Sequence, residues 1–339
     1  MSMKRREFMI SVAGLLAESG TVSQGASAQE ASSAAVRGLT GPFRVIDVHL
    51  HTLNTNAPNL SAAAKKYHPP NATIEELVRR MDEAGIDHGF LLTYSAEDLA
   101  AEIRWRKVNP VELKPVVNRA YQLNAWRAHR DRFWLFVNHS NPLRETFVED
   151  LERDFDQGAI GWKIMPLFYG FLADHPGFLP AYELCRRRRS PVIVDLSNWH
   201  IGQYPLYNEL PERQALVKTF DDYARLLDPL FSQFASVPIC LAHLGTPRGE
   251  QDHEAIFAFV KRHPNALLDT SPRMVRTTDF YQKIVDSVGP RKIMWGSDFI
   301  GSPSNLVTWR MINECNFLSE AEKALMLSGN ALRFVQGEI

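Results

Sequence analysis

The sequence predicts an α/β fold, a (β/α)8 TIM barrel with an inserted loop after its fifth strand. Short apolar runs alternate with amphipathic stretches from Phe43 onward, and there are eight such runs. The chain has 339 residues, which is long for one domain but suits one large barrel. The alternative is an open doubly wound sheet, which would need a glycine-rich phosphate loop after an early strand. The first expected strand is followed by His49-Leu50-His51 instead, so the barrel is favoured.

The expected strands are short and apolar, and stretches with helical periodicity lie between them. The strands cover residues 44–48, 88–93, 133–138, 159–164, 191–196, 238–242, 266–269 and 292–296. The helices cover residues 74–84, 116–128, 143–156, 181–189, 222–234, 253–261 and 280–288, and a last one reaches Val335. This pattern divides the chain into a leading segment over 1–40 and a barrel domain over 41–339.

Local signals set the ends of some of these helices. Thr73 can cap the helix over 74–84, because Glu76 follows three residues later, and Gly85 can end it. Pro142 opens the helix expected over 143–156.

One connection is longer than a barrel turn requires. The stretch from His200 to Phe220 contains Pro205 and Pro211 and follows the fifth expected strand. We expect an inserted loop over the barrel mouth, which is a candidate lid or specificity element.

Composition excludes several classes of partner. Lys and Arg number 38 against 39 Asp and Glu, so the net charge of −1 lacks the basic excess of a nucleic-acid-binding protein. No apolar stretch reaches the roughly 20 residues needed to span a bilayer. We therefore expect a small-molecule substrate as the partner, and the oligomeric state stays open, a homodimer included.

The first residues resemble a twin-arginine export signal. Arg5 and Arg6 precede Phe8, a short apolar stretch covers residues 9–17, and small residues follow at 26–28. A Ser- and Ala-rich tether then extends to about residue 40. This interpretation predicts a periplasmic protein, and the alternative is a disordered basic segment on a cytoplasmic one.

Two histidines end the first expected strand. In Asp47-Val48-His49-Leu50-His51, side chains two residues apart point to the same side and lie about 7 Å apart along the chain. Two imidazoles so placed can share one metal ion. In a barrel, the carboxyl ends of the strands face the active site, which is where this pair falls.

Other reactive side chains fall at equivalent strand ends. Lys163 closes the fourth strand, Asp195 the fifth, His243 the sixth and Asp298 the eighth. We expect them to converge with the histidine pair. Together with Leu241-Ala242-His243-Leu244-Gly245, Asp269-Thr270-Ser271, Gly296-Ser297-Asp298 and Gly329-Asn330-Ala331, this pattern resembles the amidohydrolase superfamily. The resemblance is to the amidohydrolase-related branch that includes aminocarboxymuconate-semialdehyde decarboxylase, and it covers the chain from about Phe43 to Val335.

The resemblance implies roles for these residues. His49, His51 and Asp298 would bind a divalent metal, and His243 and Asp298 would act in catalysis. The chain departs from the family at Asp195, where a histidine ligand is usual. Either Asp195 is an oxygen ligand in its place, or the metal is weakened or absent. We expect zinc, with manganese as the alternative, because a carboxylate ligand suits both ions.

Three further residues are candidates for binding the substrate. Lys163 could pair with a substrate carboxylate, or be a carbamylated bridge between two metals. His200 could replace the missing histidine ligand or belong to the lid, and Arg273 is available for an acidic substrate.

These residues predict an enzyme but leave its reaction open. The first interpretation is a metal-dependent hydrolase of a small ester, lactone or amide. The second is a metal-dependent decarboxylase or C–C lyase acting on a small aromatic acid, in which Asp298 or His243 protonates carbon. The third, ranked last, is a non-catalytic periplasmic binding protein that has lost its metal.

Overall fold

Eight parallel strands form one sheet in which each strand pairs with the next one along the chain. The strands are β1 (Ile46–Leu50), β2 (His88–Leu92), β3 (Phe133–Asn138), β4 (Gly161–Ile164), β5 (Val192–Val194), β6 (Ile239–Leu241), β7 (Ala266–Asp269) and β8 (Ile293–Met294). This order confirms the predicted (β/α)8 barrel.

The structure is a computed structural model that describes residues 44–67, 71–96, 109–169, 171–197, 219–247, 250–271, 277–299 and 303–338. The expected export signal and tether lie outside the described residues, and so do residues 200–218 of the expected inserted loop. Within the described ranges, no helix combines the length and the apolar character needed to cross a bilayer.

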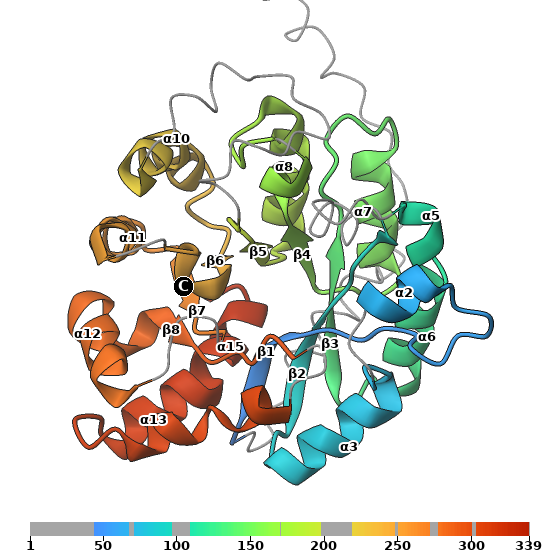
Figure 1. Cartoon of the computed structure of the whole chain (residues 1–339). Coiled ribbons are helices and arrows are strands. Elements are labelled where there is room, and N and C mark those ends of the chain that lie inside the picture. The colour runs from blue at the N-terminus through green and yellow to red at the C-terminus, as the bar shows by residue number, and fades with distance from the viewer. Residues whose placement is uncertain are drawn as a thin grey trace, which may run out of the picture.

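Helices lie between successive strands and surround the sheet (Figure 1). They are α2 (Ala62–Tyr67), α3 (Ile74–Ala84), α5 (Pro110–Leu113), α6 (Arg119–Ala128), α7 (Phe147–Asp156), α8 (Leu179–Arg188), α10 (Phe220–Gln233), α11 (Glu250–Arg262), α12 (Thr278–Val288), α13 (Arg310–Glu314), α14 (Glu320–Ala324) and α15 (Asn330–Val335). The expected ends of α3 are confirmed, because the Thr73 side chain accepts from the Glu76 amide and Gly85 adopts a left-handed conformation.

The start of α7 was predicted wrongly. The sequence places it just after Pro142, but the helix begins at Phe147. The Asn141 side chain accepts a hydrogen bond from the Leu143 amide at 3.0 Å. Such a side-chain turn offers the backbone an alternative to the helix, so the helix starts one turn later.

The barrel interior is filled by apolar side chains from the strands and from α15. Phe90 and Phe136 stack at a centroid distance of 4.8 Å, and Phe334 of α15 stacks on Phe136 at 6.1 Å. Asn330, the first residue of α15, donates to the carbonyl groups of Pro290 and Ile293, which lie at the start of β8. The last helix therefore covers the end of the barrel where the strands begin and leaves the other end for the site.

The barrel closes through fewer contacts between β8 and β1 than between other neighbours. Leu50 and Phe299 form an isolated parallel bridge. The amides of Val48 and His51 donate to the carbonyls of Trp295 and Phe299, each at 3.1 Å. We call this set of contacts the β1–β8 seam.

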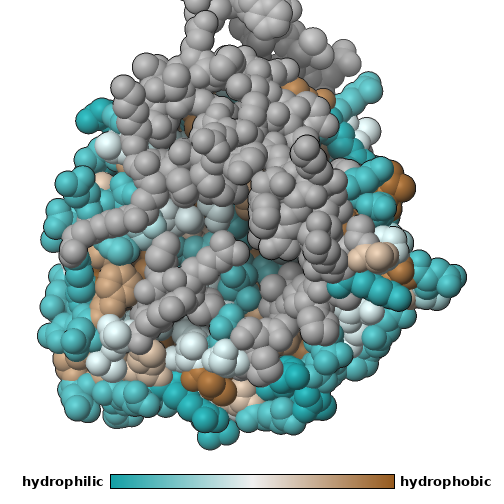
Figure 2. Space-filling view, viewed as in Figure 1, coloured by the Kyte–Doolittle hydropathy of each residue, from teal (hydrophilic) through white to brown (hydrophobic). Residues whose placement is uncertain are grey.

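The described part of the surface facing the viewer in Figure 1 is mainly hydrophilic around its rim. Figure 2 shows only separate small hydrophobic areas there.

Candidate active site

A β-bulge in β1 turns the two histidines toward the barrel interior. The pairing of β1 with β2 shifts register between Asp47 and Leu50. Ile46 and Val48 pack in the inner core, whereas Leu50 packs in the outer core between sheet and helices. The bulge adds one residue to the strand, so successive side chains no longer alternate strictly between its two faces. His49 therefore faces inward, as its neighbour Val48 does. The rings of His49 and His51 lie 5.1 Å apart, which confirms that they share one side.

The Asp47 carboxyl group supports this bulge. Its Oδ1 accepts hydrogen bonds from the amides of His49 at 3.0 Å and Ser297 at 2.9 Å. A bulge leaves an amide outside the ladder, and a buried amide needs a partner. Burial raises the pKa of Asp47 to about 7, although the hydrogen bonds from Ser297 and His49 oppose the shift. Asp47 thus fixes His49 relative to the residue before Asp298.

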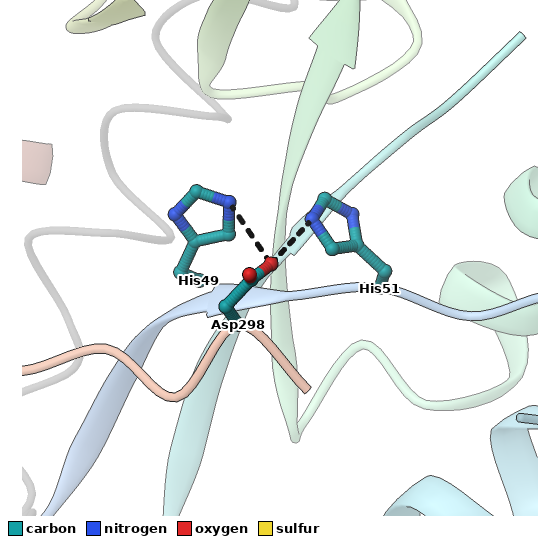
Figure 3. A group of neighbouring side chains, drawn as sticks. All are labelled: His49, His51 and Asp298. Carbon is teal, nitrogen blue, oxygen red and sulfur yellow. Dashed lines mark ion pairs between the residues drawn. The ribbon is translucent and has the colours of Figure 1, made fainter. Parts of the chain in front are cut away.

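In both histidines, Nδ1 contacts a neighbouring oxygen atom and Nε2 faces the middle of the site. His51 Nδ1 donates to the Leu92 carbonyl at 3.0 Å, and His49 Nδ1 lies 2.8 Å from Asp269 Oδ2. Asp298 Oδ1 lies 3.8 Å from His49 Nε2 and 3.6 Å from His51 Nε2 (Figure 3). These three side chains therefore present two nitrogens and one oxygen to the same point.

This group fits a divalent metal ion. His51 Nε2 is buried and, among the described residues, has no hydrogen-bond partner, as expected of a ligand atom. Carbonyl and carboxylate partners on Nδ1 are the usual way in which metal-binding histidines are oriented. Burial lowers the pKa of His51 well below its usual value and that of His49 to a lesser extent, and the Lys163 charge lowers both further. Both rings are thus kept neutral, which is the form that binds metal.

Asp195 lies beside this group and is paired with other side chains. Its Oδ2 is 3.5 Å from Lys163 Nζ and 3.6 Å from His243 Nε2, and its Oδ1 accepts from the Ser197 amide. Burial alone would raise the pKa of Asp195, but the charges of Lys163 and His243 hold it well below its usual range. Asp195 belongs to neither of the two possible metal-binding His/Asp groups found among the described residues. Its role as a ligand stays a prediction.

Lys163 is buried between two partners. Its Nζ lies 3.4 Å from His49 Nε2 as well as 3.5 Å from Asp195 Oδ2. An ammonium group and a metal ion would compete for His49 Nε2, and Asp195 offers Lys163 another partner.

His243 reaches the centre through a strained turn. His243, Leu244 and Thr246 have positive φ angles of 54°, 54° and 58°, a conformation that costs non-glycine residues free energy. The His243 amide donates to Asp269 Oδ1 at 3.0 Å, and its ring lies 4.6 Å from that of His49. Burial lowers the pKa of His243, but the charges of Asp298 and Asp195 outweigh it and raise the pKa overall.

The structure thus brings His49, His51, Lys163, Asp195, His243 and Asp298 together, as the sequence predicted. His200 and Arg273 lie outside the described residues, so their roles stay predictions.

Sequence reasoning gave no role to Asp269. This buried carboxylate accepts from the His243 amide and contacts His49 Nδ1, so it orients two site residues at once. Burial opposes its ionisation, but the contact with His49 Nδ1 and the His243 charge lower the pKa of Asp269 overall. The signal was available, because a charged residue that ends the apolar run Ala266–Asp269 occupies the strand end that faces an active site.

Comparison with known proteins identifies the family. The amidohydrolase family model matches residues 46–336. No curated protein matches the chain.

Solved structures of several enzymes share the fold. A probable 2-pyrone-4,6-dicarboxylic acid hydrolase from Acinetobacter baumannii is 17% identical, with a TM-score of 0.57, over 86% of this chain and 99% of the other. The 5-carboxyvanillate decarboxylase from Sphingomonas paucimobilis is 17% identical, with a TM-score of 0.56, over 87% and 99%. The 4-oxalomesaconate hydratase from Rhodopseudomonas palustris is 15% identical, with a TM-score of 0.57, over 86% and 96%.

The family match confirms the prediction of an enzyme, and both hydrolysis and decarboxylation fit it. Family members typically bind a divalent metal, and the His/Asp group described above could bind one. The chain belongs to the amidohydrolase family.

Proposed function

We propose that this chain is a metal-dependent hydrolase of a small ester, lactone or amide. The observation that carries the proposal is the position of Asp298, whose Oδ1 faces Nε2 of both His49 and His51. A carboxylate placed there lies next to the site of the expected metal, where it can take a proton from attacking water.

His49, His51 and Asp298 would hold the metal. Two imidazole nitrogens and one carboxylate oxygen suit zinc, and manganese is the alternative. A divalent ion supplies Lewis acidity, which polarises a carbonyl group and lowers the pKa of water.

Asp298 and His243 can take different roles in the proposed hydrolysis. Asp298 is the accessible member, with 16% of its side chain exposed against 1% and 2% for His49 and His51. It would accept the proton of the attacking water and return it to the leaving group. His243 is favoured in its protonated form and can donate a hydrogen bond to the developing oxyanion.

Decarboxylation is the second candidate, and Lys163 favours it. Its buried ammonium group faces the centre, close to His49, and could pair with the carboxylate of a substrate. The 5-carboxyvanillate decarboxylase, which shares the fold, acts on such an acid. In this reaction Asp298 or His243 would protonate the carbon that loses carbon dioxide.

The test is a substrate panel assayed with metal-loaded protein. Esters, lactones and amides are scored for hydrolysis, and aromatic acids for release of carbon dioxide. We expect about one equivalent of divalent metal per chain. Asp298→Asn should reduce hydrolysis by about 10²- to 10⁴-fold, because it removes the proton acceptor.

Asp286→Asn is the matched control, since Asp286 is an exposed carboxylate on α12. Carbon dioxide release without hydrolysis would favour the decarboxylase. Hydrolysis that is equal in Asp298→Asn and Asp286→Asn would contradict the hydrolase mechanism.

A further inference from the structure

A cavity lies beside the candidate active site, between α6 and α7. Its volume is about 620 Å³, which is typical of small-molecule sites. It is lined by Asn138, His139 and Ser140 at the end of β3, and by Ser95 after β2. Asn138 pairs in register with Lys163, so the cavity begins next to the strand ends that carry the site. Helices α5, α6 and α7 lie on the right in Figure 1.

The charges that line this cavity are mainly positive. The lining contains two carboxylates, Asp150 and Asp154, and four cationic side chains, which are Lys114, Arg119, Arg144 and Arg153. The cations therefore exceed the anions by two, in a chain whose overall net charge is −1.

The two carboxylates lie deeper in the wall than the arginines. Asp150 contacts Arg144 at 2.8 Å and Arg153 at 2.7 Å, with its side chain 12% exposed. The side chains of both arginines are 61% exposed. One carboxylate so shared neutralises one guanidinium, and each guanidinium has five N–H donors. Positive charge and free donors therefore remain on the solvent side of Asp150.

The other end of the cavity is held in place by hydrogen bonds. Asp154 is paired with Arg119 and lies 2.6 Å from His139 Nε2. The His139 carbonyl accepts from the Trp162 indole at 2.9 Å. Arg119 is thus ordered before any ligand arrives, which lowers the entropy cost of binding.

We propose that this cavity binds a small dianion, either a dicarboxylate or a phosphate compound. A dianion would balance the excess of two positive charges, and guanidinium groups bind both kinds of oxyanion with paired hydrogen bonds. The proposal does not depend on the reaction at His49, His51 and Asp298.

The test is calorimetric titration of metal-free protein with succinate and with inorganic phosphate, using succinamide as the neutral analogue. We expect saturable binding of at least one dianion and none of succinamide. The double variant Arg144→Gln/Arg153→Gln should bind about tenfold more weakly or worse. Asp150→Asn should bind more tightly than the wild type, because it removes a negative charge from the cavity wall. The probe that binds better identifies the carboxylate or the phosphate as the ligand group.

Two controls make the result specific. Arg186→Gln removes an equivalent guanidinium, since Arg186 is 50% exposed and paired with Glu183 three residues earlier on α8. It should bind like the wild type. His51→Ala should also bind like the wild type, because His51 is not part of the cavity. The proposal is wrong if neither dianion binds, if the double variant binds like Arg186→Gln, or if His51→Ala abolishes binding.

Discussion

Asp195 occupies the position at which the family usually has a histidine ligand. Its contacts indicate that it acts as a counter-ion to neighbouring side chains. Its carboxylate contacts Lys163 and His243 at 3.5 and 3.6 Å. A buried ammonium or imidazolium group without a counter-ion is costly, so Asp195 stabilises the charged forms of both. This arrangement supports the protonated His243 that the proposed hydrolysis needs.

We therefore expect Asp195→Asn to retain metal and lose activity. With metal in excess, elemental analysis should find about one equivalent per chain in this variant and little in His51→Ala. Activity should fall by about 10²-fold, because His243 loses its counter-ion. A loss of metal as large as that in His51→Ala would instead identify Asp195 as a ligand.

Asp47 makes the stability of the folded protein depend on pH. Its pKa is raised from 3.8 to about 7 in the folded protein, first of all by burial. The folded state therefore holds this proton more tightly than the unfolded state does. The resulting stabilisation is complete below about pH 4 and is lost as pH rises through 7.

The measurement is urea unfolding of metal-free wild type and Asp47→Asn across this range. Asn keeps the acceptor oxygen for the His49 and Ser297 amides but does not titrate. The free energy of unfolding of the wild type, relative to the variant, should fall by on the order of 4 kcal/mol between about pH 4 and 8. Parallel profiles would show that Asp47 is ionised throughout.

At the scale of the elements, β4 and β3 meet inside the barrel without room for a side chain. A Cβ atom at Gly161 would overlap the ring of Phe136. Phe136 packs against both Phe90 and Phe334, which also contact each other, so it cannot move aside easily.

Gly161→Ala should therefore destabilise the protein by about 1 to 3 kcal/mol. Thermal or urea unfolding measures the change. Phe136→Leu in the same chain should recover part of the loss, because it removes the overlapping atoms. If Gly161→Ala is as stable as the wild type, the core is looser than the structure indicates.

Features set by local sequence could be predicted, whereas features set by contacts between distant strands could not. Strands were found because apolar runs are local, and the cap of α3 because Thr73 and Glu76 are three residues apart. The bulge at 47–50 depends on pairing with β2, which begins at His88, and no local pattern specifies that register. Asp269 serves His49, 220 residues earlier in the chain, so its role appears only when the strands are assembled.

At the scale of the whole molecule, the candidate metal centre spans the β1–β8 seam. His49 and His51 come from β1, and Asp298 follows β8. A bound metal would therefore hold together the two strands whose backbone contacts are sparse.

Removal of metal by a chelator should lower the melting temperature by roughly 5 °C, because a ligand that binds only the folded state stabilises it. Backbone amides at the seam should exchange hydrogen faster in the metal-free protein. His51→Ala should melt at the same temperature with and without chelator. If the chelator leaves the melting temperature of the wild type unchanged, a metal that stabilises the β1–β8 seam is excluded.

The seam also affects how the protein is made. Asp47 and the Ser297 amide that it binds are 250 residues apart. The barrel can therefore close only after β8 has been synthesised and has folded beside β1. Closing a loop of this length is slow and comes late in folding. A chain interrupted between His51 and Asp298 would carry both histidines and still lack the third residue of the candidate metal centre. If His49, His51 and Asp298 bind the metal as proposed, metal uptake would therefore require a chain that has been made at least as far as Asp298.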